Sequence, residues 1–122
     1  MTPKTIFCDI DGCILLHSTN FLGSLTSDPS QVRFLPQVKE KLLDWHCQGH
    51  KIILVTGRPE RMRKDLEAIL DGNHVFYHNL IMDCGSGVRV LINDIDPRLP
   101  DVDKAVAINL MRNDGIGVIN DD

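Results

Sequence analysis

The 122-residue sequence predicts an α/β domain with a central, mainly parallel sheet and helices on both faces. Short β-prone runs alternate with segments in which apolar residues recur at helical spacing, a pattern typical of parallel sheets. The apolar fraction of 43% and the charged fraction of 25% are those of a globular protein rather than a disordered one. A chain of this length has room for one core, so we expect a single domain over residues 1–122.

Strands are expected where short apolar runs end at polar or glycine-containing turns. The first run leads directly to two acids, and a Gly-Ser-Gly turn at 85–87 precedes the fourth. Such runs, apolar on both sides, are typical of strands buried in a parallel sheet. The expected strands cover residues 5–8, 51–56, 75–82, 88–94 and 117–119.

Two helices are expected to begin at prolines and to end near glycines, the usual asymmetry of helix ends. The first runs from Pro36 towards Gly49, and the second from Pro59 to Gly72. A third is expected over residues 104–111. The sides of the first two helices that face the core are predicted to contain Val38, Leu42, Trp45, Met62, Leu66, Ile69 and Leu70.

Charge and composition exclude several classes of protein. The net charge of −4 disfavours general nucleic-acid binding, because proteins that bind duplexes are normally basic. No apolar run is long enough to cross a membrane, and the first residues lack the features of a secretory signal. The four cysteines form no C-x-x-C pair, so we expect free thiols and a cytoplasmic location.

Polar side chains follow three of the predicted strands. Asp9 and Asp11 come after the first strand, Thr56 stands at the end of the second and Asp94 at the end of the fourth. Ligands of open parallel sheets bind beyond the carboxyl ends of the strands, so these groups are expected to meet in one crevice.

Carboxylates, a hydroxyl and a cation in one crevice indicate phosphoryl transfer. Clustered carboxylates repel one another unless a cation lies between them, and Mg²⁺ prefers such oxygen ligands. One carboxylate can attack phosphorus while the other protonates the leaving oxygen. The Thr56 hydroxyl and the N–H groups of the following turn can hold the phosphoryl oxygens, with Arg58 balancing their charge.

Three segments resemble motifs of the haloacid dehalogenase (HAD) superfamily. Residues 7–15 (FCDIDGCIL) resemble its first motif, residues 53–59 (ILVTGRP) its second and residues 91–96 (LINDID) its fourth, in the family's order. The resemblance extends over residues 5–112. It implies a Rossmann-like three-layer sandwich and a Mg²⁺-dependent phosphatase that works through an aspartyl-phosphate.

The resemblance also implies a role for each matching residue. Asp9 would be the nucleophile and a metal ligand, and Asp11 the general acid and base, with its main-chain carbonyl on the metal. Asp94 would complete the metal site. An aspartate at position 11 resembles the pattern of the family's phosphatases and phosphomutases, which carry an aspartate at this position of the first motif. The residues implied to bind phosphate are Thr56, Gly57, Arg58 and Arg89.

Two positions depart from the family's pattern. The third motif normally supplies a lysine, and this chain has none between Lys64 and Lys104. Arg89 is the best substitute by position, with Lys64 and Arg58 as alternatives. The second departure concerns the further acid that the fourth motif often carries after its metal ligand, and Asp96 is the candidate for that acid.

The chain has no segment long enough for a full cap domain, so residues 13–34 are expected to form only a flap. The expected substrate is a phosphorylated small molecule, such as a sugar phosphate, and a homo-oligomer is expected because the core is small. Two alternatives stay open: a non-catalytic protein that binds a phosphorylated ligand or a partner, and a phosphatase acting on nucleic-acid ends. The acidic charge argues against the latter.

Overall fold

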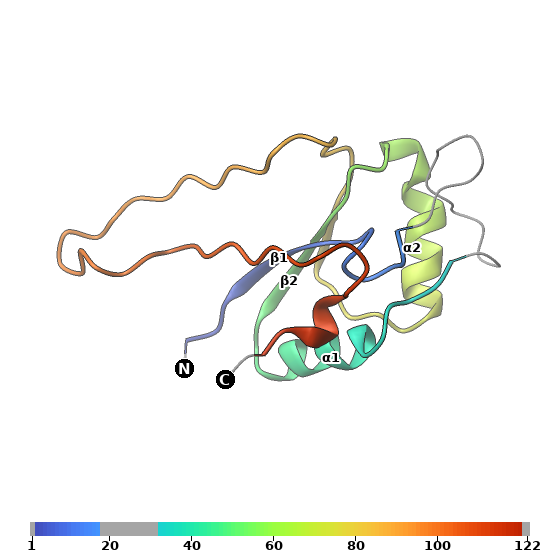
Figure 1. The fold of residues 1–122 in the computed structure, drawn as a ribbon, viewed down its shortest axis with the longest axis horizontal. Helices are drawn as coiled ribbons and strands as arrows, with labels where there is room; N and C mark the ends of the chain where they lie inside the picture. Colours follow the sequence, from blue (N-terminus) through green and yellow to red (C-terminus); the bar gives the residue numbers. More distant parts are fainter. Residues whose placement is uncertain (1, 18–31, 121–122) are drawn as a thin grey trace.

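The computed structural model describes residues 2–17 and 32–120, which form a parallel sheet, two α-helices and two short 3₁₀ turns (Figure 1). The strands pair in the order β1-β2-β3, and both pairings are parallel. This arrangement confirms the predicted α/β class with an open parallel sheet. In chain order the elements are β1 (Thr5–Asp9), α1 (Val38–Cys47), β2 (Lys51–Val55), a 3₁₀ turn (Glu60–Met62), α2 (Arg63–Gly72), β3 (Asn79–Ile81) and a 3₁₀ turn (Ile116–Val118).

One face of the sheet carries the core. Cys8 of β1 lies opposite Leu54 of β2, which lies opposite Leu80 of β3, and all three side chains are buried. The same cluster of buried side chains includes residues from both helices, among them Leu42 and Leu66. A parallel sheet in sequential order with right-handed crossovers places consecutive helices on one face, so this shared core is the expected outcome.

The opposite face of the sheet is partly open. Phe7 of β1 is 50% exposed and Ile81 of β3 is 44% exposed, while Ile53 between them is buried. These residues alternate with the core-facing ones, as the two-residue period of a strand requires. In the described part of the chain, the helices therefore cover one side of the sheet only, whereas the sequence predicted helices on both faces.

The first two predicted helices are confirmed, and so are their buried sides. Val38, Leu42 and Trp45 are the buried residues of α1. The segment after Pro59 begins as a 3₁₀ turn and continues as α2 to Gly72, with the predicted leucines and isoleucine buried. After α1, Gly49 has a φ of 88°, a conformation that suits glycine and turns the chain into β2.

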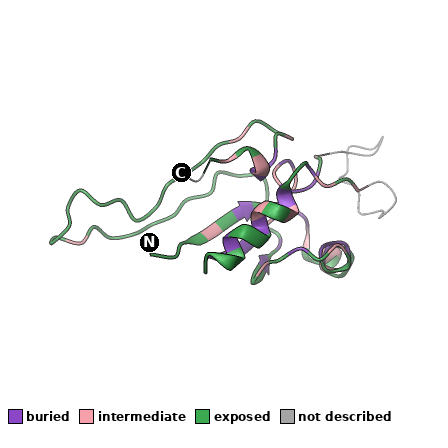
Figure 2. Ribbon diagram, turned by 90° about the horizontal axis from the view of Figure 1, so that it is seen from below, coloured by how far each residue is buried: buried purple, intermediate pink, exposed green. Residues whose placement is uncertain are grey.

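The largest correction concerns residues 88–111, called the arm below. The predicted strand over 88–94 and the predicted helix over 104–111 do not form. The arm instead runs out from the body of the molecule and back, and it is exposed along almost its whole length (Figures 1 and 2). A β-prone run becomes a strand only when a neighbour takes up its hydrogen bonds, and an eight-residue helix is marginal without packing.

The last predicted strand, over 117–119, is also wrong, because residues Ile116–Val118 form a 3₁₀ turn. Gly117 lies so close to the start of α1 that a Cβ there would be 2.5 Å from the Pro36 carbonyl oxygen. This packing shapes the segment as a turn rather than an extended strand.

The ends of the predicted flap are described, and its middle is not. An antiparallel bridge joins Leu15 to Phe34, and the Leu16 N–H donates to the Arg33 carbonyl oxygen at 2.8 Å. Residues 18–31 lie outside the described part of the chain. Within the described ranges, no helix is long and apolar enough to cross a bilayer.

Candidate active site at the end of the parallel sheet

The two acids at the end of β1 lie on either side of a buried residue. Asp9 is the last residue of β1, Ile10 is fully buried, and Asp11 follows in the next turn. The Ile10 carbonyl oxygen accepts hydrogen bonds from the N–H groups of the next residues, including Ile14 at 2.8 Å. Gly12, with a φ of 91°, turns the chain at this point. Burial of Ile10 thus leaves both carboxylates at the carboxyl end of the strand.

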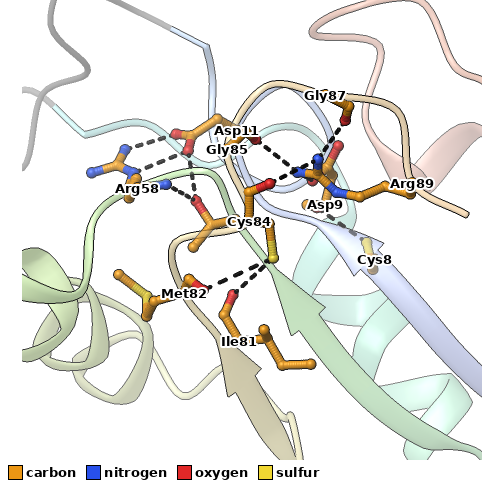
Figure 3. A network of polar contacts seen from close by, with 11 residues as sticks. Cys8, Asp9, Asp11, Arg58, Ile81, Met82, Cys84, Gly85, Gly87 and Arg89 are labelled. Carbon is orange, nitrogen blue, oxygen red and sulfur yellow. Dashed lines mark hydrogen bonds and ion pairs between the residues drawn. The ribbon is translucent and has the colours of Figure 1, made fainter.

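Arg58 holds the carboxylate of Asp11 through two parallel hydrogen bonds (Figure 3). Its Nε donates to Oδ2 at 2.9 Å, and its Nη2 donates to Oδ1 at 2.7 Å. The side chains are only 2% and 9% exposed, for Arg58 and Asp11 respectively. This bidentate pairing is the geometry that best matches a guanidinium to a carboxylate, so it fixes the direction in which Asp11 points.

Thr56 completes this part of the site. Its Oγ1 accepts a hydrogen bond from the Arg58 N–H at 3.1 Å and lies 3.5 Å from Asp11 Oδ2. Thr56 is 1% exposed. The segment after β2 therefore delivers a hydroxyl and a guanidinium to the same carboxylate, which brings Thr56 and Arg58 together with Asp11.

The turn after β2 is closed by the segment that follows β3. A Cβ on Gly57 would lie 2.7 Å from the Gly85 carbonyl oxygen, so only glycine fits at position 57. The Asp83 N–H donates to the Arg58 carbonyl oxygen at 2.8 Å, and the Cys84 N–H donates to the Thr56 carbonyl oxygen at 3.0 Å. Gly57 therefore belongs to the site through its backbone.

Arg89 lies beside Asp9 (Figure 3). Its Nη1 donates to the Gly87 carbonyl oxygen at 2.7 Å, its Nη2 to the Gly85 carbonyl oxygen at 3.2 Å, and Nη2 is 3.9 Å from Asp9 Oδ1. The Asp9 side chain is 53% exposed, so this loose ion pair leaves the carboxylate open to solvent. Of the ion pairs that the two acids make in the described part of the chain, none involves Lys64.

The structure does not bring Asp94 to the other two acids. Asp94 lies in the arm, exposed and paired with Lys104. Among the described residues, no group of three or more His, Cys, Asp or Glu side chains could hold a metal ion. Asp94 was expected at this site because a strand over 88–94 would end there, and that strand does not form.

Asp96 also lies in the arm, away from the acids after β1. It pairs with Arg98, whose Nη2 is 2.9 Å from Asp96 Oδ2. Hydrogen bonds from Arg98 lower the pKa of Asp96. The two residues are only two positions apart along the chain, so the pair is local.

The two cysteines near the acids are poor nucleophiles. Burial raises the pKa of Cys8 far above its ordinary value, and repulsion from the thiolate form of Cys13 and from Asp9 adds to the effect. Burial and the charge of Asp9 also raise the pKa of Cys13. Raised pKa values disfavour the thiolate form of both residues, so neither cysteine is a candidate nucleophile of this site.

Sequence reasoning missed one residue near the acids. Asn113 donates its N–H to the Gly12 carbonyl oxygen at 2.8 Å, directly after Asp11. The Asn-Asp-Gly sequence at 113–115 indicated only the end of a helix. Its contact with a turn at the other end of the chain depends on the tertiary fold.

No protein-family model and no curated protein matches the chain. Solved structures do. A chain in the structure of the Pnkp1/Rnl/Hen1 RNA repair complex is 30% identical, with a TM-score of 0.52 over 66% of this chain and 25% of that one. A chain in a second structure of the Pnkp1/Rnl/Hen1 complex is 28% identical, with a TM-score of 0.54 over 72% of this chain and 30% of that one.

A crystal structure of a target protein from Vibrio cholerae is 21% identical, with a TM-score of 0.51 over 76% of this chain and 80% of that one. At that identity the likeness concerns the fold alone. Our chain spans only about a quarter to a third of the two chains from the RNA repair complex. This chain therefore shares its α/β fold with part of a chain from an RNA repair complex and with most of the Vibrio cholerae protein.

Proposed function

We propose that the chain is a phosphatase of the HAD superfamily, which hydrolyses a phosphomonoester through an aspartyl-phosphate. One observation carries the proposal: an exposed carboxylate, Asp9, stands at the end of a parallel strand beside a second carboxylate that is fixed in direction. Thr56 and Arg58 reach Asp11 from the next strand, and Arg89 lies beside Asp9. A nucleophile, an acid and two cations are the groups that phosphoryl transfer requires.

The reaction has two steps. Asp11 first leaves its pair with Arg58 and takes up a proton. A carboxylate oxygen of Asp9 then attacks phosphorus, and the bond from phosphorus to the ester oxygen breaks as Asp11 gives that oxygen this proton. Water then attacks the phosphorus of the aspartyl-phosphate while Asp11 takes up a proton from it. The bond to Asp9 breaks, which releases inorganic phosphate and restores the carboxylate. Thr56 and Arg89 hold the phosphoryl oxygens during both steps.

Mg²⁺ is part of the proposal. In phosphoryl-transfer sites this ion needs one or two carboxylates, besides phosphate oxygens and water, and the exposed carboxylate of Asp9 fits that requirement. The ion would supply neutralisation of the charge on the phosphoryl group. Asp94, expected from the sequence as a further ligand, stands in the arm with Lys104, so the proposal rests on Asp9 and not on a complete set of protein ligands.

The first substrate class to test is a phosphorylated small molecule, such as a sugar phosphate. A phosphorylated nucleic-acid end is the second, and the likeness to a chain of an RNA repair complex favours it. A non-catalytic protein that binds a phosphorylated ligand is the remaining candidate. The pairing of Asp11 with Arg58 favours it, because a carboxylate in that pair must leave it before it can act on a substrate.

The experiment is phosphate release from a panel of sugar phosphates, nucleotides and oligonucleotides with a 3′- or 5′-phosphate. It compares Mg²⁺ with EDTA and the wild type with Asp9→Asn. Loss of a covalent nucleophile is expected to lower turnover by about a thousandfold or more. The matched control is Asp101→Asn, an exposed carboxylate of the arm, which is expected to leave turnover unchanged.

Metal-dependent release that disappears in Asp9→Asn supports the proposed enzyme, and the preferred ester names the substrate class. Equal release of phosphate by the wild type and by Asp9→Asn contradicts the role of Asp9. A folded protein that binds phosphorylated ligands without releasing phosphate would instead support the non-catalytic alternative.

A further inference from the structure

We propose that Asn113 is a positioning residue, which holds the turn that carries Asp11. The inference rests on the proposed function and concerns a residue outside all the motifs in the sequence. Asn113 comes two positions after the end of the arm. It lies 96 residues along the chain from its partner His17.

Asn113 makes one hydrogen bond to each end of a short loop. Its N–H donates to the Gly12 carbonyl oxygen at 2.8 Å, and its Oδ1 accepts from the His17 N–H at 2.6 Å. The Gly12 N–H in turn donates to the Leu15 carbonyl oxygen at 2.7 Å. A single side chain and its own backbone thus connect the first and last residues of the loop 12–17.

The backbone conformation of Asn113 explains why asparagine suits this position. Its φ is 71°, in the left-handed region, which asparagine and aspartate tolerate better than other residues except glycine. Glycine would tolerate the same φ but has no side-chain acceptor for His17. Alanine has neither property, and aspartate has both, although it adds a negative charge.

Asp11 is therefore held from two directions. Arg58 fixes its carboxylate from the segment after β2. Asn113 fixes its backbone, through Gly12, from the segment that follows the arm. Asn113→Gly and Asn113→Ala keep the N–H that reaches Gly12 and lose only the acceptor for His17, so the loop 12–17 is then held by Asn113 at one end instead of two. We expect this loosened loop to let the turn that carries Asp11 shift relative to the bound phosphoryl group, while the contacts of Thr56 and Arg89 persist.

A displaced proton donor has a recognisable kinetic effect. Esters with a poor leaving group, such as an alkyl phosphate, need a proton on the leaving oxygen. The p-nitrophenolate of p-nitrophenyl phosphate leaves readily without one. Misplacement by about 1 Å costs up to about a hundredfold in rate. We expect Asn113→Gly to lower kcat/KM, which reports the first step, by about 10- to 100-fold for the alkyl ester, with a much smaller fall for p-nitrophenyl phosphate.

The experiment compares Asn113→Gly, Asn113→Ala and Asn113→Asp with the wild type, and uses Asp114→Ala, an exposed neighbour, as the control. Both esters are assayed, and hydrogen exchange of the His17 amide is followed in parallel. Asn113→Asp is expected to retain kcat to within a few-fold and to keep the His17 amide protected. Asn113→Gly and Asn113→Ala are expected to lose that protection.

An equal fall in kcat/KM for both esters, or unchanged kcat/KM in Asn113→Gly, would overturn the inference. Unchanged exchange of the His17 amide in Asn113→Gly would also overturn it. If the wild type hydrolyses neither these two esters nor any ester of the panel described above, the proposed function fails and with it the catalytic consequence of Asn113. The His17 amide alone then decides whether Asn113 holds the loop.

Discussion

Similar β-prone sequences are buried in the body of the molecule and exposed in the arm. Ile52 in β2 has no exposed surface, whereas Ile92 in the arm is 91% exposed, although both lie in runs of β-prone apolar residues. The difference is the neighbour: β2 has a parallel strand on each side, and residues 88–92 have none. β-propensity favours an extended backbone, but only pairing and packing bury it.

The acids show the same contrast. Asp11 of the body forms a bidentate pair with Arg58, and both side chains are almost buried. Asp94 of the arm pairs with Lys104, and the Asp94 side chain is 78% exposed. Burial therefore separates a carboxylate with a fixed direction from one that is free to exchange its partner for water.

Hydrogen exchange is expected to show the largest difference between the two regions. Amides of β2 should exchange only when the whole domain unfolds, while amides of the arm have few backbone partners. With a typical free energy of unfolding of at least about 5 kcal/mol, the β2 amides exchange at least about a thousandfold more slowly. Protection of residues 88–94 equal to that of β2 would mean that this segment is paired in solution.

Removing an arginine or a lysine from the two ion pairs should have the next largest effect. Arg58→Ala leaves the nearly buried Asp11 carboxylate without its partner, which typically costs about 3–5 kcal/mol. Lys104→Ala removes a partner from the exposed Asp94 and should change the free energy of unfolding by less than about 1 kcal/mol. Urea denaturation of both variants measures this difference, and equal losses would contradict it.

Truncation of apolar residues gives a third comparison. Leu54→Ala leaves a cavity in the core and is expected to cost about 2–5 kcal/mol. Ile92→Ala, its counterpart in the arm, removes a side chain in contact with solvent and should stay within about 0.5 kcal/mol of the wild type. A large loss in Ile92→Ala would show that the arm packs against something in solution.

The smallest expected effect is a pH dependence. Burial, together with a hydrogen bond to Asp71, raises the pKa of Tyr77 to about 12 from an ordinary value of 10.0. The folded state therefore holds this proton more tightly, so the stability it adds is complete below pH 10 and is lost as the pH rises towards 12.

Tyr77→Phe should remove this alkaline loss, which thermal unfolding between pH 9 and pH 12 measures. Asp96→Asn is the counterpart in the arm. The lowered pKa of Asp96 predicts a loss of stability on acidification, but the Asp96–Arg98 pair is local and exposed, so we expect no measurable change. An alkaline loss that persists in Tyr77→Phe would assign it to another group.

Much of the body could be predicted from the sequence because its signals are local. Pro36 and Pro59 indicated where the helical segments begin, and the spacing of Leu42 and Trp45 indicated a buried side. Short apolar runs indicated the three strands. The positions of Asp9, Asp11 and Thr56 after these strands then followed from the parallel order of the sheet.

The remaining features depend on contacts between distant residues. Nothing in the run 88–94 indicates whether a neighbouring strand will pair with it. The position of Asp94 therefore could not be predicted from the residues around it. The pairing of Arg58 with Asp11 and the approach of Asn113 to Gly12 join segments far apart in the chain.

The sequence by itself thus predicted the groups that we propose to act on a phosphate: two carboxylates, a hydroxyl and nearby cations. Only the tertiary structure decided which of them meet, because side-chain chemistry is local and proximity is not. It placed Arg58 on Asp11 and Arg89 beside Asp9, and it left Asp94 in the arm.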